Sequence, residues 1–112
     1  MTSRHGHLLS DPRVRGWIEN AGNGCEATAA AYLRALGRFL SRAGLTVDGL
    51  LDLARRDPLA LRDRMAAVLH DMAAEGRLPA TLHFMKATVS SFLRYNGAEV
   101  PLKIRIRGAG RN

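Results

Sequence analysis

Arginine recurs at every fourth position in the stretch CEATAAAYLRALGRFLSRAG, at Arg34, Arg38 and Arg42. On a helix turning 100° per residue these positions lie at roughly 0°, 40° and 80°, opposite an apolar side centred at about 200°. A guanidinium presents a fork of N–H donors that matches two oxygens of a phosphate or a carboxylate. The stretch has one acid, Glu26, at its start. Two interpretations stay open: an anion-binding face, or a solvated face that only favours solubility.

Residues capable of catalysis or metal binding occur without forming a recognisable site. His5 and His7 make an H-x-H pair, which would leave most of a metal's coordination sphere to water. Cys25 precedes a helix, where a thiol pKa can fall, and we interpret it as a helix-start residue. Asp71 and Glu75 share the edge of one helix and are interpreted as surface residues. No G-x-S-x-G, P-loop or G-x-G-x-x-G motif occurs, so we expect no catalytic residue, metal or cofactor.

The composition of the 112 residues indicates one basic domain. Hydrophobic residues make up 46% of the chain, enough for one modest core, and the net charge is +7. Residues 46–76 hold six acidic and four arginine side chains, a net charge of −2, so the rest of the chain carries +9. This segregation favours a polyanionic partner, although an arginine-rich composition is equally typical of a GC-rich genome.

Cysteine content and hydropathy indicate the compartment. A lone cysteine excludes an internal disulfide and a cysteine zinc site, which favours a reducing environment. No apolar run approaches the ~20 residues of a membrane span, and the N-terminus lacks a signal-peptide core. We therefore expect a cytoplasmic protein without a membrane contact.

Helix-start and helix-stop residues predict an all-α fold. Asp11 with Pro12, and Asp57 with Pro58, are start signals, while Gly44 is a typical helix end. The predicted helices run over residues 12–21, 25–43, 46–56, 58–75 and 79–95. Residues 11–98 are thus expected to form a compact bundle of four to five helices, preceded by a flexible N-terminus over residues 1–10. Residues 99–112 are expected to be a basic linker outside the core.

Two helices carry a family resemblance. The stretch CEATAAAYLRALGRFL contains Thr28, Tyr32, Leu36 and Phe39, and the stretch PATLHFMKATVSSFLRYNG contains Thr81, Val89, Phe92 and Tyr95. Together they resemble the core-binding domain of tyrosine recombinases and phage integrases, a SAM-like helical domain, over residues 11–100. Cys25 stands where that family usually has a serine N-cap. The resemblance implies a prokaryotic or phage-encoded protein.

The resemblance also implies a function, namely clamping duplex DNA near the crossover site in DNA integration or recombination. In the family a second domain carries the tyrosine nucleophile, so this chain is expected to be a non-catalytic DNA-binding domain. Family members also associate with copies of themselves in a synapse, which implies possible self-association. The alternative that we keep open is a SAM-like protein-interaction module whose apolar groove takes a partner helix.

The residues expected to contact DNA come from two helices and the tail. On the second helix Arg34, Arg38 and Arg42 are the candidates. On the last helix the expected outward face holds His83, Ala87, Ser90, Ser91 and Arg94, with Thr88 near its edge and Lys86 near the apolar border. Lys103, Arg105 and Arg107 would match the family's interdomain linker. The predicted interface is one positive surface made by both helices.

Overall fold

The structure is a computed structural model that describes residues 5–104. A 3₁₀-helix, η1 (Gly6–Ser10), precedes five α-helices: α1 (Pro12–Gly22), α2 (Glu26–Ala43), α3 (Val47–Arg56), α4 (Pro58–Ala74) and α5 (Pro79–Tyr95). No strand occurs among the described residues, so the prediction of an all-α bundle is confirmed. In the same part of the chain, no helix combines the length and apolar character that crossing a membrane requires.

Local capping explains where the helices begin and end. The Asp11 carboxylate accepts a hydrogen bond from the Arg13 N–H at 2.8 Å, and the Thr46 hydroxyl accepts one from the Gly49 N–H at 3.0 Å. Asp57 accepts likewise from the Ala60 N–H, so each of these side chains satisfies a donor that the first helical turn leaves unpaired. Gly44, with a φ of 69°, ends α2 in the left-handed conformation that favours glycine.

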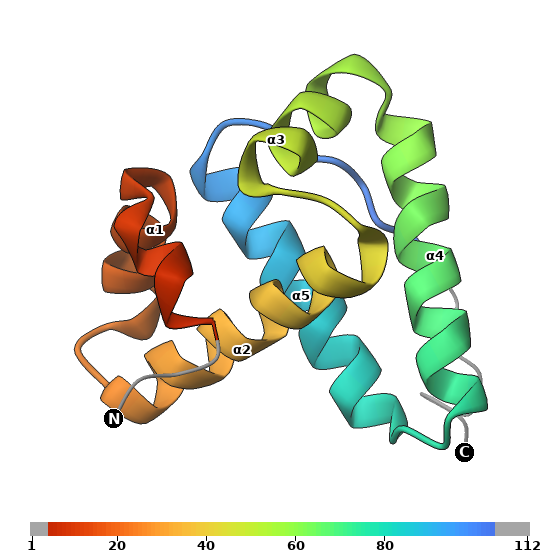
Figure 1. Cartoon of the computed structure of the whole chain (residues 1–112), viewed down its shortest axis with the longest axis horizontal. Helices are drawn as coiled ribbons and strands as arrows, with labels where there is room; N and C mark the ends of the chain where they lie inside the picture. The colour runs from red at the N-terminus through yellow and green to blue at the C-terminus, as the bar shows by residue number, and fades with distance from the viewer. Residues whose placement is uncertain (1–4, 105–112) are drawn as a thin grey trace.

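Helices α2 and α5 cross at the centre of the molecule. α2 packs on α5 and passes in front of it in Figure 1, with α1 on one side and α3 and α4 on the other. The core between them includes fully buried side chains from every α-helix: Val14, Trp17, Leu36, Phe39, Leu50, Leu61, Met65, Met72, Val89, Phe92 and Leu93. The buried side of α2 thus fixes which residues its other side presents to solvent.

Trp17 joins α1 to both central helices. Its ring packs edge-on against Phe92 at 5.3 Å and lies 5.9 Å from the ring of Tyr32. Its indole N–H donates to the Ser91 hydroxyl at 3.0 Å, which satisfies the polar end of a buried side chain. This contact orients α1 against α2 and α5.

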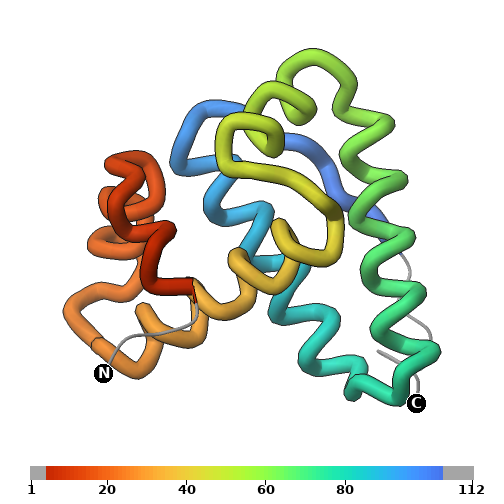
Figure 2. Tube along the Cα trace, viewed as in Figure 1, coloured from red at the N-terminus to blue at the C-terminus, as the bar shows by residue number. Residues whose placement is uncertain are grey.

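Both ends of the described chain differ from expectation. Residues 6–10, expected to be loose, form η1, and Leu8 is buried in the core. After α5, Ala98, Val100 and Leu102 are also buried, so the expectation that residues from 99 onward lie outside the core is wrong for this part. Figure 2 shows this segment running behind α3 toward α4. Arg105 and Arg107 lie outside the described residues.

Candidate nucleic-acid interface

α2 presents two arginines on its solvent side. Leu33, Leu36, Phe39 and Leu40 bury one side of this helix, and Arg34 lies exposed on the other, with Arg38 half-buried one turn further along. The four-residue spacing places the two Cα atoms about 6 Å apart along the helix axis. Because the core holds α2, the positions of both side chains are set by a rigid element.

The described arginines differ in whether another residue engages them. Those with a hydrogen-bond or ion-pair partner are Arg13, Arg15, Arg42, Arg55, Arg56, Arg62, Arg64, Arg77 and Arg94. Within residues 5–104, Arg34 and Arg38 make no hydrogen bond or ion pair through their guanidinium groups. Their donors are therefore available to an external anion.

Arg42 has an internal partner that the sequence did not reveal. Its two terminal nitrogens donate to the two carboxylate oxygens of Glu75 at 2.8 and 2.6 Å. The hydrogen bond from Arg42 holds the pKa of Glu75 below its ordinary value. Arg42 thus has an acidic partner that its own stretch of sequence did not indicate, because the end of α4 packs beside the end of α2.

Two further arginines satisfy helix ends. Arg64 of α4 donates to the carbonyl of Ala43, the last residue of α2, at 2.5 Å. Arg55 of α3 donates to the carbonyl of Asn96, just after α5, at 3.1 Å. Such contacts neutralise the negative end of a helix dipole and fill acceptors that lack a partner in the helix. The sequence gives no local signal for them, since each joins segments more than 20 residues apart.

The α5 candidates divide into exposed and engaged residues. His83, Ala87 and Arg94 are exposed and Ser90 is half-buried, and Arg94 lies 3.7 Å from the Glu99 carboxylate. Ser91 is not an outward residue, because its hydroxyl accepts the Trp17 N–H. Thr88, expected near the exposed edge, is only 1% exposed.

The remaining candidates lie around the segment after α5. The Lys86 ammonium donates to the Ile104 carbonyl at 3.3 Å, so it engages this segment. Lys103 is exposed between the buried Leu102 and the half-buried Ile104. This alternation follows the period of two in the sequence VPLKIRIRG and leaves Lys103 in solvent.

α2 and α5 share an aromatic contact two residues before Arg34. Tyr32 of α2 stacks on Phe84 of α5, with ring centres 5.6 Å apart and planes 12° from parallel. Arg34 follows Tyr32 by two residues and so lies about 160° around α2 from it. Arg34 therefore points away from this aromatic contact, and toward the end of α2 the arginines continue to α4 through Arg42 and Arg64.

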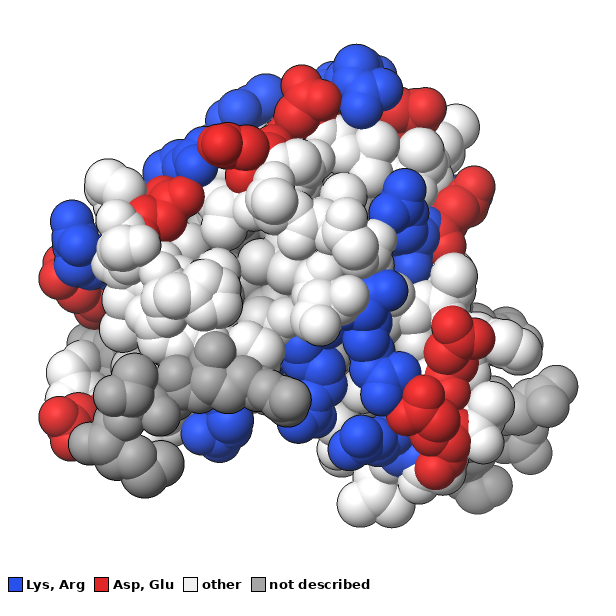
Figure 3. All heavy atoms as spheres, viewed as in Figure 1, with Lys and Arg blue, Asp and Glu red and all other residues white. Residues whose placement is uncertain are grey.

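We call this surface the α2 basic strip and define it as Arg34, Arg38, Arg42, Arg64 and Arg77. Arg34, Arg38 and Arg42 follow one another at one-turn spacing, and Arg64 joins the end of α2. Arg77 lies 3.7 Å from the Glu75 carboxylate that also binds Arg42. Figure 3 shows basic side chains crossing the lower part of the molecule, with acidic side chains bordering them along α4. The two unpaired arginines belong to the α2 part of the strip.

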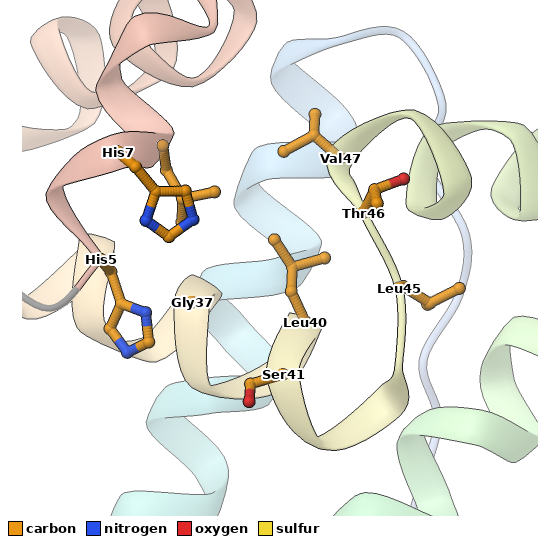
Figure 4. Close-up of a pocket in the computed structure, with 9 residues that line it drawn as sticks. His5, His7, Gly37, Leu40, Ser41, Leu45, Thr46 and Val47 are labelled. Atoms are coloured by element: carbon orange, nitrogen blue, oxygen red, sulfur yellow. The ribbon is translucent and has the colours of Figure 1, made fainter.

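A pocket beside α2 brings the N-terminal histidines together. Its volume is about 480 Å³, and His5 and His7 line it with residues of α2 and of the α2–α3 connection (Figure 4). His5 lies against Gly37, where a Cβ atom would come within 2.3 Å of the ring. Among residues 5–104, no three His, Cys, Asp or Glu side chains are grouped to hold a metal. The lining residues include two imidazoles and the hydroxyls of Ser41 and Thr46.

Cys25 is exposed immediately before α2. The nearby Thr28 side chain, together with the backbone N–H groups of Thr28 and Ala27 at the start of α2, lowers the pKa of this thiol. The direction agrees with the sequence-based interpretation of Cys25 as a residue at a helix start.

In comparisons with known proteins, no family model, no curated protein and no solved structure matches this chain. Exposed large apolar side chains are distributed over several elements, at Leu9, Leu59, Leu78, Phe84 and Tyr95. These residues lie on η1, α4, α5 and the α4–α5 connection, whereas Arg34, Arg38 and Arg42 follow one another at one-turn spacing on α2.

Proposed function

We propose that this chain is a duplex-DNA-binding domain of the SAM-like core-binding type, and that Arg34 and Arg38 contact backbone phosphates. The observation that carries the proposal is the pair of arginines one turn apart on α2, engaged by no other described residue. A guanidinium donates two parallel hydrogen bonds to a phosphate, and its charge displaces condensed counterions from DNA. The net charge of +7 supports the same partner.

We expect the isolated chain to bind duplex DNA weakly and without sequence specificity. Phosphate contacts fix the register of a protein on a duplex without reading its sequence. Two free arginines on one helix would give non-specific affinity on the order of 10⁻⁴ to 10⁻⁶ M at physiological salt. In a tyrosine recombinase, the family that α2 and α5 resemble, the catalytic domain would close around the other side of the duplex. The proposed role of this chain is thus binding without catalysis.

The two tyrosines fit this non-catalytic role. Tyr32 is half-buried, with its ring near Trp17 and stacked on Phe84. The Tyr95 hydroxyl lies beside Gly16 of α1, where a Cβ atom would meet it at 2.8 Å. Both side chains contribute contacts between helices, and the proposal assigns neither of them a nucleophilic role.

The test is duplex binding by the double variant Arg34→Ala/Arg38→Ala. We expect its affinity for a labelled duplex of ~30 base pairs, followed by fluorescence anisotropy at ~50 mM salt, to fall about tenfold or more. Its melting temperature should change little, because both side chains lie outside the core.

The matched control removes the same charge elsewhere. Arg56→Ala/Arg62→Ala takes two exposed arginines from the α3–α4 junction, where each has an adjacent acid as its partner. We expect this variant to keep its affinity within about threefold of the wild type, since the two arginines lie outside the α2 basic strip. If both double variants lost the same affinity, the loss would be explained by net charge alone, which would contradict the assignment of DNA binding to α2. Failure of the wild type to bind at ~50 mM salt would contradict the proposal itself and favour the protein-interaction module.

A further inference from the structure

The carboxylate of Glu75 accepts two hydrogen bonds from the guanidinium of Arg42, as a phosphate would. The two oxygens of this carboxylate accept from the two terminal nitrogens of Arg42, at 2.8 and 2.6 Å. Arg42 continues the line of Arg34 and Arg38 at one-turn spacing on α2. Its side chain is 25% exposed and that of Glu75 is 46% exposed, so the pair is accessible from solvent. An anion arriving at the strip can therefore reach both partners.

Glu75 also lies near a second cation of the strip. The Arg77 side chain approaches the same carboxylate oxygen at 3.7 Å, and the pair Arg42–Glu75 joins the end of α2 to the end of α4. One carboxylate thus offsets two guanidinium groups at the α4 end of the α2 basic strip. Arg34 and Arg38, at the other end, have no such acid among the described residues.

We propose that Glu75 masks Arg42 and thereby limits the affinity of the α2 basic strip for nucleic-acid phosphates. The inference rests on the proposed function and adds a residue that sets its strength. A carboxylate and a phosphodiester both present two anionic oxygens, so they compete for the same donors of Arg42. While Glu75 holds Arg42, phosphate binding depends on Arg34 and Arg38. Removing the carboxylate charge releases Arg42 as one additional phosphate contact.

The experiment is a double-mutant cycle on the full chain with a labelled ~30 base-pair duplex. Glu75→Gln keeps the length of the side chain and removes its charge, and we expect its affinity at ~50 mM salt to rise about fivefold or more. Its salt slope should steepen by about one, the value expected for one added phosphate contact. Arg42→Ala should lower the affinity less in the wild-type background than in the Glu75→Gln background, because Glu75 already engages this arginine in the wild type. The variant Glu75→Gln/Arg42→Ala should lose most of the gain.

A matched control separates masking from net charge. Asp63→Asn also removes one exposed acid of an ion pair, at the start of α4, and should leave the affinity within about twofold of the wild type. If Glu75→Gln binds no better than the wild type while Arg34→Ala/Arg38→Ala binds worse, the masking is refuted and the proposed function stands. An equal gain from Asp63→Asn also refutes the masking. If neither the wild type nor Glu75→Gln binds at ~50 mM salt, both proposals fall.

Discussion

The Thr88 hydroxyl is buried in α5 without a hydrogen-bond partner among the described residues. The residue is 1% exposed, so on folding this oxygen loses its hydrogen bonds to water and gains none from the described residues. An unsatisfied buried hydroxyl costs about 1–3 kcal/mol of stability. Threonine at this position therefore weakens the bundle relative to an apolar side chain of the same shape.

We predict that Thr88→Val stabilises the protein, because valine keeps the shape and removes the unpaired oxygen. The expected gain is about 1 kcal/mol in the free energy of unfolding, or roughly 4 °C in melting temperature. Thermal denaturation followed by circular dichroism measures it, with Thr81→Val, half-exposed at the start of α5, as a neutral control. A variant less stable than the wild type would show that the hydroxyl has a stabilising contact.

Asp11 combines a helix cap with an ion pair. Its carboxylate accepts from the backbone N–H of Arg13, and the Arg13 guanidinium reaches both this carboxylate and Asp48 of α3 at 2.7 and 2.6 Å. The hydrogen bond from the Arg13 side chain holds the pKa of Asp11 below its ordinary value of 3.8. The ionised form is thus favoured in the folded state, and its contribution to stability is lost as the pH falls below about 4.

We predict that Asp11→Asn destabilises the protein at pH 7 by about 0.5–1 kcal/mol and by less at pH 2.5. Asparagine keeps the capping oxygen and loses the ion pair, while at low pH the wild type loses that pair as well. Urea denaturation at the two pH values measures the difference. A difference that stays constant between pH 7 and pH 2.5 would contradict the assigned ion pair.

At the scale of elements, the segment after α5 belongs to the bundle. Val100 and Leu102 are buried and Ile104 packs partly against the same core, while Lys103 between them is exposed. Lys86 of α5 holds the segment through the Ile104 carbonyl. The segment thus covers apolar surface that the five α-helices leave open.

We predict that Leu102→Ala costs about 2–4 kcal/mol in the free energy of unfolding, the usual range for removing a buried leucine side chain. Urea denaturation measures this cost, and Lys103→Ala, one residue further on and exposed, should stay within about 0.5 kcal/mol of the wild type. If the two variants were equally stable, the segment would not be part of the core.

The elements show which parts of a fold a sequence can reveal. Asp11 and Asp57 act within one helical turn, so the capping rules placed the starts of α1 and α4 correctly. Leu8 and Leu102 lie outside the helical patterns, and their burial depends on helices distant in sequence. Their place in the core followed from the packing of the whole bundle, which local periodicity does not describe.

At the scale of the whole molecule, helix packing divided the arginines into different roles. Glu75 lies 33 residues from Arg42, and the sequence gives no reason to pair them. Helical periodicity correctly placed Arg34 on the solvent side of α2, because that depends on one helix alone. The relation between the exposed sides of α2 and α5 depends on how the two helices cross, which the periodicity of either helix alone does not describe.

The central claim is that Arg34 and Arg38 bind the phosphates of a duplex. The measurement that tests it most directly is the salt dependence of duplex binding, by anisotropy between ~50 and ~200 mM salt, for the wild type and Arg34→Ala/Arg38→Ala. Two lost phosphate contacts should make the slope of log affinity against log salt shallower by about 2. Equal slopes for the two proteins would contradict the claim, because they would show that neither arginine displaces counterions from the duplex.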